Sequence, residues 1–187
     1  MEILFVHGAG GWMDDQPLAA ELRNRLNVPV VMPEFPEEDM SAAQWRRELE
    51  RWLASMEPGA VVVGHSFGAS MALLHYADEG GADEGGADDG GADGDRAPAP
   101  LGLVLLATPA WGTEGWQAEY ALPPAAQLRL PVRLHHCRDD DVVPFAHLER
   151  LAERIPHAAV RRHATGGHQF EGRMGAIAED VAALGNL

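Results

Sequence analysis

The chain has 187 residues, 46% of them hydrophobic, and a formal net charge of −15 at pH 7. This length supports one domain with a sizeable core, which we place over residues 1-187. The basic residues are all arginine and gather in no basic patch, so the composition argues against nucleic acid as a partner. The single cysteine, Cys137, excludes an internal disulfide and a cysteine-based metal cluster.

No targeting signal is recognisable in the sequence. The first apolar run, residues 3-6, begins almost at the initiator and meets Gly8 at once, which does not fit a secretory signal. No uninterrupted apolar stretch approaches the roughly 18 residues of a membrane span. We therefore expect a cytoplasmic protein without a membrane partner.

Short apolar runs alternate with helical patterns along the chain. The runs are continuous rather than alternating in polarity, which is typical of strands covered on both faces. In chain order, the predicted strands are residues 3-6, 29-32, 60-64, 101-107, 132-137 and 158-163. The predicted helices are residues 41-56, which open with a capping-box pattern at Ser41, the segment after Ser66, and residues 145-155 and 171-184. This alternation predicts a mostly parallel, doubly wound α/β sheet with helices on both faces.

One acidic segment interrupts the pattern. Residues 79-93 read EGGAD, EGGAD and DGGAD, and they contain no large apolar side chain. Such a segment cannot bury enough surface to offset the entropy lost on ordering, so we expect 78-100 to be a disordered insertion. Calcium binding is an alternative, although calcium-binding glycine repeats place a large apolar residue in each turn. A further alternative is an interaction tail for a basic partner protein.

The pentapeptide Gly64-His65-Ser66-Phe67-Gly68 stands where a buried strand ends and a helix begins. G-x-S-x-G at such a junction is typical of the nucleophile elbow, a sharp turn that exposes a serine hydroxyl above the sheet. Ser66 is therefore the candidate nucleophile. The alternative is a serine that only caps the helix.

A serine hydroxyl needs a base, and the chain has nine histidines. His168 follows the last strand beside two glycines, which let its loop approach the serine, and we select it as the base. The others are expected to pack in the core (His135 or His136), to point away from the site (His75), to flank its turns (His7, His65) or to lie at the surface (His147, His157, His163).

Two further parts complete the candidate site. Asp139, Asp140 and Asp141 follow the fifth strand and offer an orienting carboxylate for the histidine; an acidic turn without function is the alternative, and a metal site fits less well. The glycine-rich loop after the first strand brings the Ala9 amide into reach of a ligand, and it would pair with the Phe67 amide as an oxyanion hole. A tight turn or a phosphate loop is the alternative, but the pattern lacks G-x-G-x-x-G.

Together, HGAGG, GHSFG, DDDVVP and GGH, with Ser, Asp and His in that order, resemble the α/β-hydrolases. Within them the chain is similar to the small lid-less serine hydrolases of the retinoblastoma-binding-protein type, over nearly its whole length except the acidic insertion. The family motif D-x-V-V-P has its catalytic acid four residues before proline. That position maps to Asp140, with Asp139 and Asp141 as second choices.

The resemblance also implies a fold. The family usually has two antiparallel strands before the HG strand, and this chain starts at the HG strand. We therefore expect about six strands and no cap domain, and right-handed crossovers predict the strand order 2-1-3-4-5-6.

The implied activity is acyl transfer from small or medium carboxylic esters by Ser66, His168 and Asp140, with no cofactor and no metal. In this fold, loops that overhang the serine carry Trp12, Met13, Trp111 and Trp116, which are expected either to line the substrate pocket or to pack in the core. An amidase, a thioesterase or a non-catalytic binding protein that kept the fold are the alternatives.

Overall fold

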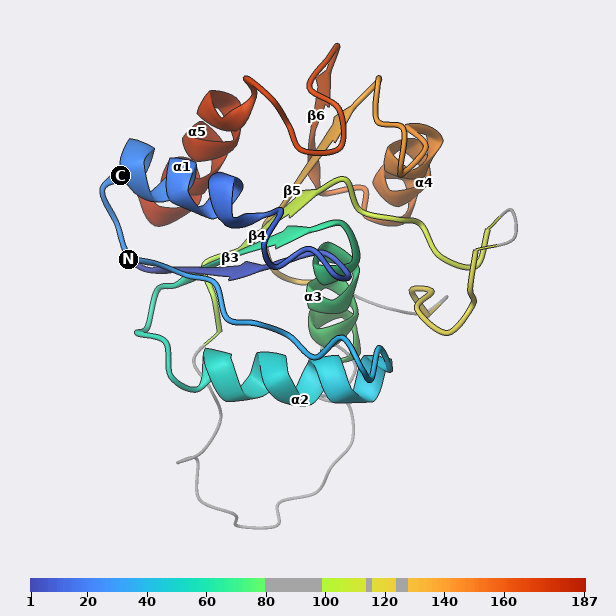
Figure 1. Cartoon of the computed structure of the whole chain (residues 1–187), viewed down its shortest axis with the longest axis horizontal. Coiled ribbons are helices and arrows are strands. Elements are labelled where there is room, and N and C mark those ends of the chain that lie inside the picture. Colours follow the sequence, from blue (N-terminus) through green and yellow to red (C-terminus); the bar gives the residue numbers. More distant parts are fainter. Residues whose placement is uncertain (80–98, 114–115, 124–127) are drawn as a thin grey trace.

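The structure is a computed structural model that describes residues 1–79, 99–113, 116–123 and 128–187. Within these residues, six strands form one sheet in the order β2-β1-β3-β4-β5-β6, and every neighbouring pair runs parallel (Figure 1). The strands are β1 (Ile3–Val6), β2 (Val30–Val31), β3 (Val61–His65), β4 (Leu103–Leu106), β5 (Val132–Cys137) and β6 (Ala159–His163). The predicted α/β architecture and strand order are confirmed.

Helices cover both faces of this sheet and form two cores. Helices α2 (Ala42–Leu53), α3 (Ser66–Glu79) and α4 (Ala146–Arg154) pack in one core, and α1 (Gln16–Leu26) and α5 (Met174–Gly185) pack in the other. In Figure 1, α1 and α5 lie above the central strands and α2 and α3 lie below them. Leu4 and Val6 face the first core, whereas Ile3 and Phe5 face the second. Successive strand residues point to opposite faces, so a strand covered on both sides is apolar at every position.

Helix boundaries follow local signals in part. Ser41 Oγ accepts a hydrogen bond from the Gln44 amide at 3.3 Å, as the capping-box pattern predicts. Helix α1 was not among the predicted helices, although it has a proline in its first turn and ends at Asn27 in the left-handed conformation. Asp15 occupies its N-cap position but makes no capping hydrogen bond. The site described below explains where that carboxylate goes.

The predicted insertion 78-100 falls mostly outside the described residues, since residues 80–98 are not described. Its first two residues belong to α3, and β4 begins at Leu103. In the part of the chain that the structure describes, no helix is long and apolar enough to cross a membrane.

Candidate active site

The turn from β3 to α3 holds Ser66 in an unusual conformation. Ser66 is the first residue of α3 and has φ 52°, in the left-handed region that residues other than glycine seldom adopt. A Cβ atom on Gly64 would lie 2.5 Å from Ala69 Cα, and one on Gly68 would lie 2.2 Å from His7 O. A side chain fits at neither position, so the strand and the helix can pass this closely only because both positions are glycine. The serine therefore stands at a helix N-terminus, where free N–H groups favour negative charge.

The glycine-rich loop after β1 lies against this serine. Because Val6 pairs with Gly64 in the parallel sheet, the carboxyl ends of β1 and β3 coincide. A Cβ atom on Gly8 would lie 3.3 Å from Ser66 Cβ. Within the described part of the chain, the amides of Ala9 and Phe67 donate to no backbone carbonyl of a turn, loop or cap. Both predicted oxyanion donors thus belong to turns that meet at Ser66.

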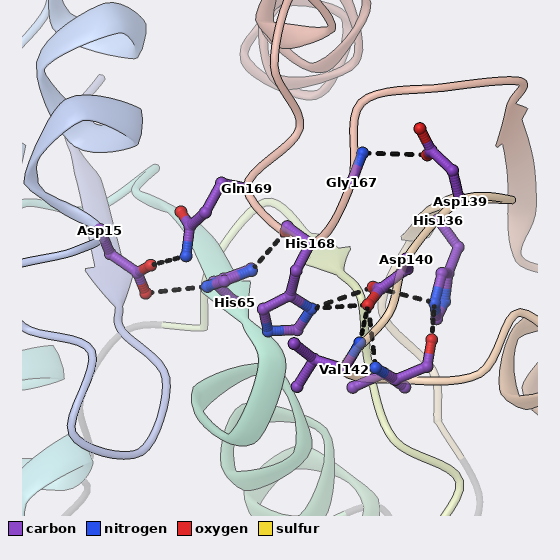
Figure 2. A network of polar contacts seen from close by, with 10 residues as sticks. Asp15, His65, His136, Asp139, Asp140, Val142, Gly167, His168 and Gln169 are labelled. Carbon is purple, nitrogen blue, oxygen red and sulfur yellow. Dashed lines mark hydrogen bonds and ion pairs between the residues drawn. The ribbon is translucent and has the colours of Figure 1, made fainter.

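His168 and Asp140 face each other across the ends of β6 and β5. His168 Nδ1 lies 2.9 Å from Asp140 Oδ2 and 3.1 Å from Oδ1 (Figure 2). The Asp140 side chain is fully buried, whereas that of His168 is 14% exposed. A carboxylate only accepts hydrogen bonds, so the proton of a neutral His168 ring sits on Nδ1 and Nε2 remains a free base. His168 also lies beside the elbow, since its ring centroid is 4.6 Å from that of His65, the residue before Ser66.

Asp140 is held as a carboxylate by its donors. Oδ1 accepts the amides of Val142 and Val143 at 2.9 Å each, and His136 Nε2 lies 3.3 Å from Oδ2. Burial acts to raise the pKa of Asp140, but the hydrogen bonds from His136, His168 and Val143 outweigh it and hold the pKa well below its usual range. The group is therefore charged wherever His168 would act as a base.

The two neighbouring acids have other surroundings. Asp139 accepts the amides of Gly166 at 3.2 Å and Gly167 at 2.9 Å, so it fixes the loop that leads to His168. Asp141 is exposed. Of the three acids that the sequence left open, Asp140 is the one that contacts His168.

A second aspartate–histidine pair lies beside the first, and sequence reasoning missed it. Asp15 and His65 are each 1% exposed, and Asp15 Oδ2 lies 2.9 Å from His65 Nδ1. The same oxygen accepts the Gly8 amide at 2.9 Å, and Oδ1 accepts Gln169 Nε2 at 3.2 Å. The available signal, Asp14-Asp15 ahead of a helix, indicates a helix cap, so nothing local in the sequence marks the inward role of Asp15.

Burial acts to raise the pKa of Asp15, but the hydrogen bond and charge of His65, together with bonds from Gly8 and Gln169, lower it below its ordinary value.

Comparison with known proteins places the chain in a family. The sequence matches the model of the alpha/beta hydrolase family over residues 3–120. The chain belongs to this family. A search of the curated proteins finds no match.

Three solved structures share the fold of this hydrolase at low sequence identity. Alpha/beta hydrolase domain-containing protein 10 from mouse is 16% identical with a TM-score of 0.69, and the match covers 99% of this chain and 88% of that one. The esterase domain of a Rhodothermus marinus protein is 15% identical with a TM-score of 0.65, over 99% and 84% of the two chains. A lipase-esterase related protein from Clostridium acetobutylicum is 12% identical with a TM-score of 0.69, over 98% and 93%.

The predicted pocket residues of the hydrolase fall into two groups. The ring centroids of Trp111 and Trp116 lie 5.1 Å apart, and Trp111 Nε1 donates a hydrogen bond to Ser70 Oγ at 2.7 Å. Trp111 also lines a cavity of about 190 Å³ with Ser70, Leu73, Tyr120, Leu122 and Leu151. Trp12 and Met13 instead follow the loop after β1, where the Met13 side chain is 69% exposed. Of the four residues, Trp111 is the one that lines this cavity.

This cavity lies next to the elbow. Ser70 Oγ reaches the Ser66 carbonyl at 3.5 Å, one helical turn back along α3. The Phe67 ring contacts Tyr120 at 4.9 Å and Trp111 at 5.8 Å. Phe67, the residue that follows Ser66, therefore packs against two of the side chains that line the cavity.

The remaining histidines correct one expectation. His147 and His163 were expected at the surface, but both are buried. His147 Nδ1 accepts the Ala110 amide at 2.8 Å, and His163 Nε2 lies 3.1 Å from His135 Nδ1. Both therefore have polar partners in the interior, which a local pattern does not reveal. Among the described residues, no group of three or more histidine, cysteine or acidic side chains could hold a metal ion.

Proposed function

We propose that this protein is a serine hydrolase of carboxylic esters, with Ser66 as nucleophile, His168 as base and Asp140 as the acid that orients it. One observation carries most of the weight. A buried carboxylate at 2.9 Å from Nδ1 of His168 leaves Nε2 of that ring unprotonated, and the ring centroid lies 4.6 Å from that of His65, the residue before a serine held at φ 52°. Family membership supports a hydrolase, and because the same fold carries many activities, the site decides among them.

The reaction follows from these positions. Ser66 Oγ attacks the ester carbonyl carbon while His168 Nε2 takes its proton, and the amides of Ala9 and Phe67 bind the oxyanion. The C–O ester bond then breaks, and His168 returns the proton to the departing alcohol. Water then attacks the acyl-serine while His168 takes its proton, the bond from the acyl carbon to Ser66 Oγ breaks, and His168 returns the proton to Oγ as the carboxylic acid leaves. Asp140 keeps the ring in the required tautomer and stabilises the imidazolium in both steps.

We infer that the substrates are small or medium esters. The cavity beside Phe67 is about 190 Å³ and mostly apolar, which suits a short acyl or alcohol group better than a long chain. This assignment also agrees with the proposed kinship to the small lid-less hydrolases of the retinoblastoma-binding-protein type. A panel of acetate, butyrate, octanoate and laurate esters tests it: turnover should peak among the shorter chains, and a flat profile would contradict it.

Labelling with a fluorophosphonate probe tests the activity itself. The wild-type protein should be labelled at Ser66, located by peptide mapping, and Ser66→Ala should not be labelled. A folded wild-type sample that resists the probe would favour a binding protein without catalysis. Comparing ester, thioester and amide substrates then separates an esterase from a thioesterase or amidase.

A further inference from the structure

We propose that Asp15 and His65 form a buried carboxylate–imidazolium clamp that positions His168 against Ser66. This inference rests on the proposed function, because it assigns positioning residues to the same site. His65 ends β3 and immediately precedes Ser66, and Asp15 lies just before α1. Figure 2 shows the His65 ring between the Asp15 carboxylate and the backbone of His168.

The clamp joins three parts of the site. His65 Nε2 lies 3.0 Å from the carbonyl oxygen of His168, so the neighbour of the nucleophile is bonded to the backbone of the base. Asp15 binds His65 Nδ1 and the Gly8 amide through one oxygen and the Gln169 side chain through the other. One buried carboxylate thus ties the loop after β1 to the end of β3 and to the loop after β6.

The hydrogen bonds determine the charge of His65. A carbonyl oxygen can only accept, so the bond to His168 requires a proton on Nε2. Asp15 accepts the Gly8 amide on Oδ2 and the Gln169 side chain on Oδ1, and its pKa lies below the ordinary value, so it has no proton to give and its bond to the ring requires a proton on Nδ1. Both ring nitrogens are therefore protonated, and His65 is a cation beside the Asp15 anion.

The charge of the His65–Asp15 pair also affects the protonation of His168 by Ser66. The His65 ring centroid is 4.6 Å from that of His168, which becomes a cation whenever it accepts the serine proton. An isolated cation at this distance would oppose that step, and the Asp15 carboxylate neutralises it.

The loop that carries His168 needs such support. Gly166, Gly167 and Phe170 all have positive φ, at 138°, 59° and 54°. Asp139 holds the two glycine amides on one side of His168, and the clamp holds its carbonyl on the other. A shift of about 1 Å in a base can cost roughly 100-fold in rate, so losing one of these anchors should lower kcat more than it changes KM.

Kinetics of matched variants provide the first test. Asp15→Asn should lower kcat for p-nitrophenyl acetate by roughly 10- to 100-fold with KM changed by less than about threefold, whereas Asp14→Asn, at the exposed neighbouring position, should behave as wild type. His65→Gln keeps an amide donor near the position of Nε2 and should retain more activity than His65→Asn, which reaches only toward Asp15. Equal activity of Asp15→Asn and Asp14→Asn, or equal losses in the two His65 variants, would overturn the proposal. The His65 pair decides the matter if Asp15→Asn does not fold.

A spectroscopic test does not depend on turnover. In ¹⁵N-histidine spectra recorded at the pH of the esterase assay, wild-type His65 should show two protonated ring nitrogens. The signal is assigned by its loss in His65→Gln, and in Asp15→Asn it should change to that of a neutral ring. A neutral His65 in the wild type would overturn the clamp even if Ser66 is labelled. Absent labelling with a doubly protonated His65 would instead count against the proposed function alone.

Discussion

Replacing Asp140 by asparagine should convert His168 into the wrong tautomer. The amides of Val142 and Val143 both point at Asp140 Oδ1, so the asparagine oxygen must remain there to accept them. The new NH₂ group then takes the place of Oδ2, which lies 2.9 Å from His168 Nδ1. Because two donors cannot share that contact, Nδ1 must become an acceptor and the ring proton must move to Nε2. A protonated Nε2 cannot take the proton of Ser66 Oγ.

The expected loss in kcat is roughly 10³- to 10⁴-fold, or about 4–5.5 kcal/mol of transition-state stabilisation. The free energy of unfolding should also fall by about 1–3 kcal/mol, because a buried charged acceptor is lost. Steady-state hydrolysis of p-nitrophenyl acetate and urea denaturation measure the two quantities separately.

Asp141→Asn is the matched control, since it makes the same substitution at the next residue, whose side chain is exposed. It should stay within about 0.5 kcal/mol of wild type in stability and close to wild type in activity. If Asp140→Asn keeps more than about a tenth of the wild-type kcat, the tautomer argument fails. If Asp141→Asn or Asp139→Asn loses more activity than Asp140→Asn, the wrong acid has been assigned.

Two other predictions concern packing and pH. Gly68→Ala should destabilise the fold by several kcal/mol, since its Cβ would lie 2.2 Å from His7 O and 2.3 Å from Val6 O. Gly175→Ala is the control, because a Cβ atom there would lie 3.5 Å from Arg25 Nη1, an ordinary contact. It should leave the free energy of unfolding unchanged or raise it by at most about 1 kcal/mol. Comparable losses of stability in the urea melts of the two variants would count against this packing argument. Burial lowers the pKa of His163 from 6.5 to about 4, and the charges of His135, Arg173 and Arg161 act in the same direction. The carboxylate of Asp180 opposes this shift more weakly. As the pH falls from 6.5 towards 4, the unfolded chain binds a proton that the folded chain does not, so the free energy of unfolding should fall by about 2–3 kcal/mol from this group. His163→Gln should flatten that part of the curve and exposed His157→Gln should not; equal slopes in all three proteins would show that His163 does not titrate in this way.

The site residues separate into those that a local pattern can reveal and those that it cannot. Gly64, Ser66 and Gly68 are recognisable because a strand–turn–helix junction imposes its backbone requirements within five positions. His168 and the three acids after β5 were chosen because each follows a predicted strand, and parallel strands bring their carboxyl ends to one edge of the sheet. The choice of Asp140 came from resemblance to a family motif, and its contact with His168 depends on how two distant loops meet.

The sequence by itself determined where the strands lie along the chain, since burial on both sheet faces makes each strand apolar throughout. It also determined the elbow, whose glycines are needed for close backbone contact. Only the tertiary structure revealed the clamp. Asp15 and His65 are 50 positions apart, and His168 lies a further 103 positions along the chain. Hydrogen bonding between such residues depends on burial in one shared interior, and an aspartate before a helix has the same local sequence whether it caps that helix or turns inward.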